Sequence, residues 1–61
     1  MVTTQHMRNE FGNYLIRWKK HFEESHMSNE EIVNEFMWDY RLYEEEIFNE
    51  LLAIIKNDKQ E

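Results

Sequence analysis

Cysteine and proline are absent from this 61-residue chain, and glycine occurs only once, at Gly12. Without cysteine the fold has neither disulfide bonds nor thiolate ligands for a metal. Sheets and loop-rich folds rely on glycine and proline in their turns, so their scarcity predicts long, uninterrupted helices. A chain this short is too small for more than one core. We therefore expect residues 1–61 to form one all-α domain.

Basic residues are also scarce: seven Lys and Arg stand against thirteen Asp and Glu, a formal net charge of −6. Residues 1–27 carry four basic and three acidic side chains, net +1, whereas residues 28–61 carry three and ten, net −7. Such a chain is repelled by phosphate backbones, which argues against direct nucleic-acid or anionic-membrane binding. The longest apolar run, Leu51 to Ile55, is too short to span a bilayer, and no signal pattern opens the sequence. We expect a cytoplasmic protein.

The spacing of apolar residues predicts two helices. The first, over about residues 5–24, has an apolar stripe at steps of three and four. Ser28 and Glu31 then have the spacing of a capping box, which predicts a second helix that begins at Asn29, with Met27 and Ile32 as its hydrophobic staple. No helix breaker follows before Asn57, so this helix is expected to run to about residue 56. Its stripe is formed by Phe36, Tyr40, Tyr43, Ile47, Leu51 and Ile54.

These two helices predict an antiparallel hairpin. At 1.5 Å per residue they are roughly 30 and 42 Å long, so the first cannot cover the end of the second. Leu51, Leu52, Ile54 and Ile55 would stay uncovered. A second copy of the chain is the simplest cover, because symmetric homodimers are the commonest oligomers. The stripe is therefore expected to form the core or a dimer interface, in a four-helix bundle completed by dimerisation.

An aromatic and aliphatic pair lies on the opposite face of the second predicted helix. Trp38 and Leu42 are four residues apart, hence neighbours on a helix, with Glu35, Glu45 and Glu46 around them. An exposed tryptophan beside a leucine, ringed by polar groups, is typical of a protein-binding hot spot. The alternative interpretation is a wider core or the dimer interface itself.

Chemistry beyond binding has little support in the sequence. No nucleophile, phosphate loop or cofactor motif stands out, and the single Glu23-x-x-His26 spacing lacks the further ligands of a di-iron site. We therefore expect no enzyme, no metal and no cofactor. The favoured function is a small acidic regulator or inhibitor of a protein target, of the kind that phages and mobile elements encode. One alternative is a DNA mimic whose acids occupy the groove of a nucleic-acid-binding enzyme; the third is a structural or assembly dimer.

Overall fold

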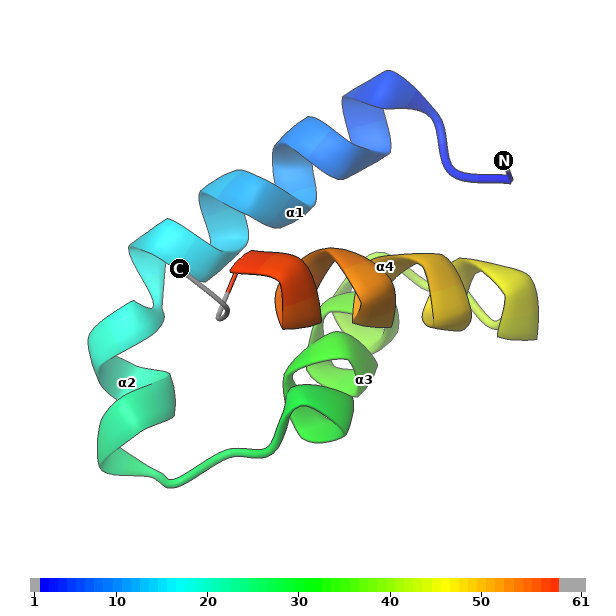
Figure 1. Cartoon of the computed structure of the whole chain (residues 1–61). Helices are drawn as coiled ribbons and strands as arrows, with labels where there is room; N and C mark the ends of the chain where they lie inside the picture. The colour runs from blue at the N-terminus through cyan, green and yellow to red at the C-terminus, as the bar shows by residue number, and fades with distance from the viewer. Residues whose placement is uncertain (1, 59–61) are drawn as a thin grey trace.

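The structure, a computed structural model, describes residues 2–58 and contains four helices there (Figure 1). They are α1 (Gln5–Arg17), α2 (Lys19–Glu24), α3 (Asn29–Asp39) and α4 (Glu45–Asp58). No strand occurs among these described residues, which confirms the all-α class.

The first predicted helix is present, but it bends at Trp18 into α1 and α2. Thr4 caps its start, because the Met7 N–H donates to Thr4 Oγ1 at 3.0 Å. At the bend Trp18 has φ −107° and ψ 13°, outside ideal helical values. The helical hydrogen bonds nevertheless continue, with the Trp18 N–H on the Tyr14 carbonyl at 3.1 Å and the Phe22 N–H on the Trp18 carbonyl at 3.0 Å. The chain therefore changes direction within a nearly continuous helix.

The capping box at the start of α3 is confirmed. The Glu31 N–H donates to Ser28 Oγ at 3.2 Å, and the Ser28 N–H donates to Glu31 Oε1 at 3.2 Å. Two backbone donors at the helix start are satisfied reciprocally. Met27 packs against the core cluster that includes Ile32, as the staple requires.

The second predicted helix, residues 29–56, is wrong as a single element, because α3 ends at Asp39 and α4 begins only at Glu45. Arg41 adopts a left-handed conformation with φ 55°. Its N–H donates to the Trp38 carbonyl at 3.2 Å, and the Leu42 N–H donates to the Met37 carbonyl at 2.8 Å. This pair of bonds is a Schellman motif, which closes a helix C-terminus and turns the chain away.

The end of α2 has the same geometry. His26 has φ 54°, its N–H donates to the Glu23 carbonyl at 3.3 Å, and the Met27 N–H donates to the Phe22 carbonyl at 3.1 Å. Both Schellman motifs place a residue with a side chain where glycine is usual. A left-handed residue other than glycine costs about 1–2 kcal/mol, so tertiary packing must stabilise each turn.

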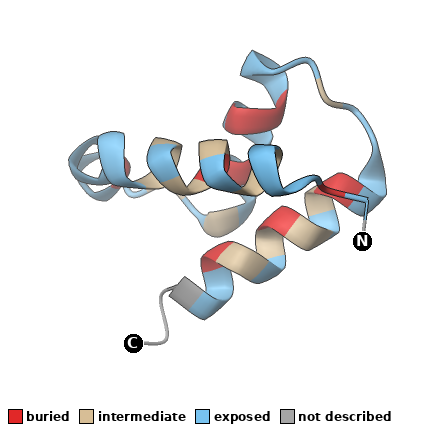
Figure 2. Ribbon diagram, turned by 90° about the horizontal axis from the view of Figure 1, so that it is seen from above, coloured by how far each residue is buried: buried red, intermediate tan, exposed pale blue. Residues whose placement is uncertain are grey.

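For the turn after α3, the packing that stabilises it is the burial of α4. The turn after α3 brings α4 back across α3 (Figure 1). From α1, Phe11 reaches the same core, with its ring centroid 4.9 Å from that of Phe36. The buried faces of the helices point toward one another (Figure 2). The core consists of Phe11, Phe22, Ile32, Val33, Phe36, Met37, Ile47, Leu51 and Ile55. Three of these come from α4, and each such side chain contributes about 1.5–3 kcal/mol when buried, which outweighs the cost of the turn.

The fold also corrects the two-helix hairpin. Leu51 and Ile55 are 0% and 2% exposed, and Leu52 and Ile54 are partly buried. The apolar end that was expected to need a second copy is thus covered within the chain itself. Dimerisation stays a prediction, but this stripe no longer requires it.

Candidate protein-binding groove

A groove of about 460 Å³ lies where the end of α3 meets the start of α4. It is lined by Asn34, Met37, Trp38, Leu42, Tyr43, Glu44, Glu45 and Phe48. Most of these side chains are apolar, and the two carboxylates come from the α4 end. The volume falls within the range of ligand pockets, about 300–1,000 Å³.

The turn after α3 builds this groove. It separates Leu42 from the helix, so that Leu42 packs half-buried against the core while Trp38 stays on the last turn of α3. Trp38 and Tyr43 are 72% and 75% exposed. Two large aromatic side chains in water on either side of one turn form the main exposed apolar feature of the groove.

Trp38, Leu42 and Glu45 line the groove together, as members of the set expected to bind a partner. The turn, and not helical spacing, brings them together, because Leu42 lies beyond the end of α3 and is not a helical neighbour of Trp38. Glu46 is exposed but outside the lining, and Glu35 lines a different pocket. A partner-binding role for these residues stays a prediction.

The expected apolar stripe is divided by the turn. Phe36, Ile47 and Leu51 are buried and Ile54 is partly buried. Tyr43, by contrast, faces the groove, and sequence reasoning missed it as a candidate binding residue. The acidic run after it, which marks a helix start, was the available signal.

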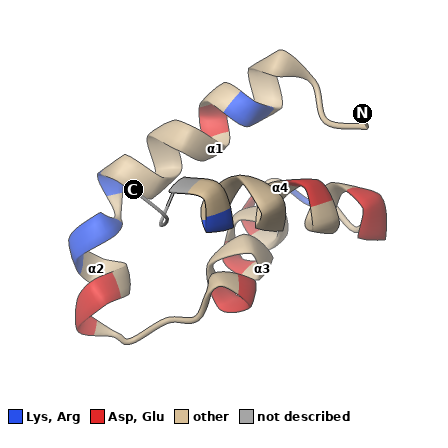
Figure 3. Cartoon of the chain, viewed as in Figure 1, with Lys and Arg blue, Asp and Glu red and all other residues tan. Residues whose placement is uncertain are grey.

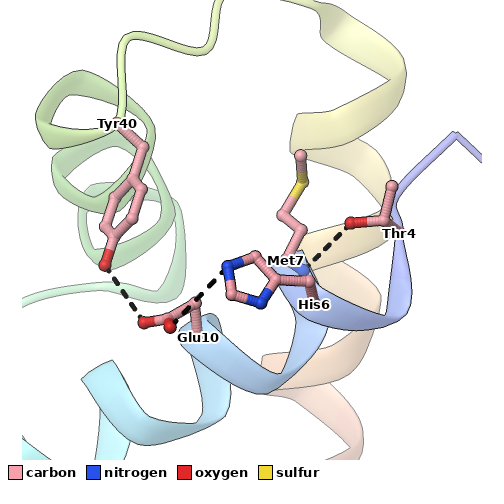
Figure 4. A network of polar contacts seen from close by, with 5 residues as sticks. All are labelled: Thr4, His6, Met7, Glu10 and Tyr40. Carbon is pink, nitrogen blue, oxygen red and sulfur yellow. Dashed lines mark hydrogen bonds and ion pairs between the residues drawn. The ribbon is translucent and has the colours of Figure 1, made fainter.

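Tyr40, the other tyrosine of that stripe, lies at the edge of the core and is 48% exposed. Its ring stacks on Phe36, with centroids 4.4 Å apart, and its hydroxyl donates to Glu10 Oε2 at 3.4 Å (Figure 4). Glu10 also lies 3.9 Å from His6 Nε2 (Figure 4). These contacts join α3 to the first turns of α1 and hold that side of the fold together.

Charge is distributed unevenly over the surface. Acidic side chains mark the starts of α3 and α4, whereas Lys19 and Lys20 lie on α2 (Figure 3). Glu45 and Glu46 in the first turn of α4 are favoured by the positive end of its helix dipole. The groove is therefore apolar at its base and negative along its α4 side.

Among residues 2–57, whose side chains the structure describes, no three His, Asp or Glu side chains converge in a way that could hold a metal ion. Over the same residues, none of the helices has the length and apolar character that crossing a bilayer demands. No protein-family model matches the chain, and no curated protein or solved structure shows significant similarity to it. The geometry of the groove is thus the main guide to function.

Proposed function

We propose that this chain is a protein-binding regulator or inhibitor, and that its groove takes an apolar side chain from a basic, amphipathic segment of a target protein. The observation that carries the proposal is the exposure of Trp38 and Tyr43, 72% and 75%, on the rim of a 460 Å³ apolar groove. Monomeric proteins seldom leave such aromatic pairs in water, and interfaces are enriched in both residue types.

The shape of the groove supports a small number of strong contacts. Met37 and Phe48 lie at its base, Trp38 and Tyr43 on its rim. A side chain inserted between the rims would be desolvated on both sides, which is where hot-spot energies arise. Backbone hydrogen bonds already hold the turn in place, so binding should cost little further conformational entropy of the main chain.

The charge of the groove supports a basic partner. Glu44 and Glu45 belong to its lining and Glu46 is next to them. Opposite charge on the partner would steer the encounter and reject acidic competitors. A target segment that carries Lys or Arg beside its apolar anchor fits both properties.

The test is affinity capture with the whole chain, its Trp38→Ala variant and an Ile16→Ser control. Ile16 is a suitable control because it is 78% exposed, similar to the 72% of Trp38, but lies on α1 outside the groove lining. A target should be retained by the wild type and the control, while Trp38→Ala weakens binding by about 2 kcal/mol or more. Equal retention by all three chains contradicts the proposal, provided that circular dichroism shows unchanged helicity.

The DNA-mimic alternative predicts a different ranking. If the acids imitate a phosphate ladder, reversing Glu45 and Glu46 to lysine abolishes binding, Trp38→Ala has little effect, and affinity falls steeply with salt. Under the groove proposal the charge reversal mainly slows association. A salt titration of the captured complex with both variants distinguishes the two functions.

A second copy of the chain is the other possible occupant of the groove, as an assembly dimer would require. Sedimentation across micromolar concentrations tests it. If the groove binds a target, Trp38→Ala should dissociate the target complex, whereas the mass of the free chain should stay the same. A wild-type dimer that becomes a monomer in Trp38→Ala would instead assign the groove to self-association.

A further inference from the structure

A second pocket, of about 330 Å³, lies between the bend at Trp18 and the outer side of α3. Aromatic side chains from the α1–α2 bend form one wall, mainly Tyr14, Trp18 and Phe22. Two carboxylates of α3, Glu35 and Asp39, form the other. No residue of this pocket belongs to the lining of the Trp38 groove, so the two are separate sites.

The aromatic wall is held in place by its own packing. The ring of Tyr14 lies 5.5 Å from that of Phe22 and 5.2 Å from that of Phe36, centroid to centroid. Trp18 makes an edge contact with His21 at 6.0 Å and remains 46% exposed. The pocket is thus pre-shaped, and an indole borders solvent at its edge.

The carboxylate wall makes the pocket negative. Glu35 and Asp39 are one helical turn apart, so they lie on the same side of α3. The pKa of Tyr14 is raised, first by burial of its hydroxyl and then by the charges of Asp39 and Glu35. The last turn of α3 carries no basic residue, although the negative end of a helix dipole favours cations there. Helix stability alone therefore does not account for Asp39.

We propose that this pocket binds the guanidinium group of an arginine side chain presented by another polypeptide. Aromatic faces attract cations, and an indole does so most strongly. Two neighbouring carboxylates can accept the forked N–H groups of a guanidinium, whose plane also stacks on aromatic rings. A metal ion fits less well, since no three carboxylate or imidazole groups converge among the described residues. The volume lies at the low end for ligand pockets, which suits one side chain.

The experiment uses the full chain with Trp38→Phe. The sequence has two tryptophans, so this variant leaves Trp18 as the single indole fluorophore. N-acetyl-arginine amide is titrated against its neutral isostere, N-acetyl-citrulline amide, and against N-acetyl-lysine amide. We expect a saturable change in Trp18 emission with the arginine compound, weaker binding of lysine, and no response to citrulline.

Three variants then test the carboxylates. Glu35→Gln and Asp39→Asn should each weaken arginine amide about tenfold, the effect of losing a charged hydrogen-bond acceptor. Glu30→Gln, on the same helix but outside the pocket, is the matched control and should bind as the parent does. The proposal is overturned if citrulline or lysine binds as well as arginine, if no saturable change occurs, or if Glu30→Gln weakens binding as much as the other two. Because the two sites share no lining residue, a negative result leaves the groove proposal standing.

Discussion

The hydroxyl of Thr3 donates a hydrogen bond of 2.7 Å to Glu50 Oε1 and so joins the first residues of the chain to the middle of α4. The Thr3 N–H reaches the same oxygen at 3.0 Å, and the Val2 N–H reaches Oε2 at 2.7 Å. Thr3 is only 4% exposed, and the Arg8 guanidinium donates to its carbonyl at 2.6 Å and to its hydroxyl at 3.0 Å. One carboxylate therefore receives three hydrogen bonds from a segment distant in sequence.

Glu50 should make stability depend on pH. The Val2 N–H, followed by the hydroxyl and N–H of Thr3, lowers the pKa of Glu50 from 4.5 to about 2. Because the folded-state pKa is the lower one, the contribution is full above pH 4.5 and is lost as the pH falls from 4.5 toward 2. Glu50→Gln should lower the melting temperature at neutral pH and remove this part of the pH dependence. Melting curves across that range measure it, with the exposed Glu24→Gln as control; the same acid slope in Glu50→Gln and wild type would contradict it.

Replacing Arg41 by glycine should stabilise the protein by about 0.5–1 kcal/mol. The left-handed φ of 55° strains a residue with a Cβ, whereas glycine accepts it, and the gain is reduced by the greater backbone freedom of glycine in the unfolded chain. Arg41→Ala, which retains the Cβ, is the control and should show no such gain. Chemical denaturation measures both; equal stability of the two variants would mean that the backbone at Arg41 is not the source of strain.

Ser28→Ala should destabilise the fold by about 0.5–2 kcal/mol, because it leaves the Glu31 N–H without its acceptor. Ser25→Ala, at an exposed position before the same turn, is the matched control and should change stability little. Thermal melts with an unshifted midpoint in Ser28→Ala would show that the capping box contributes nothing to stability.

Asp39→Asn should stabilise α3 while it weakens arginine binding. The carboxylate of Asp39 lies at the negative end of the helix dipole, so its removal should gain about 0.3–1 kcal/mol. Glu35→Gln, one turn earlier, should gain less, since the dipole acts mainly within the last turn. Denaturation of both variants tests the order; a loss of stability in Asp39→Asn would indicate that the carboxylate is held by favourable contacts within the fold.

Local signals in the sequence were sufficient for much of the fold. The start of the first helix at Gln5, its end at Glu24 and the start of α3 at Asn29 were predicted from apolar spacing and one capping box. These features depend on residues within a few positions of each other, which is why periodicity reveals them. The bend at Trp18 went unpredicted because it hardly interrupts the hydrogen bonding.

The turn at Arg41 was missed because it lacks the residues that usually announce one. Neither glycine nor proline occurs there, and an apolar stripe can be drawn straight through it. The acids Glu44, Glu45 and Glu46 were the available signal, since acidic residues favour a helix start. The turn is decided by the burial of Ile47 against the rest of the core, a tertiary effect that propensity does not contain.

The binding sites were predictable to different degrees. Trp38 and Leu42 could be chosen from composition alone, although the wrong geometry was assigned to them. The pocket beside Trp18 could not, because the bend and α3 meet only in the folded chain. The contact between Glu50 and Thr3 could not be predicted either, because it spans 47 residues.

The order of the helices, with α4 after the three that it covers, has a consequence for synthesis on the ribosome. The core needs Ile47, Leu51 and Ile55, so Phe11 and Phe36 cannot be fully covered while only α1 to α3 have emerged. Proteins are made at about 5–20 residues per second, so the nascent chain carries exposed aromatic side chains for the time that the synthesis of α4 takes. The core should therefore close only after α4 has emerged, and this interval is when chaperones or the target itself can first bind the chain.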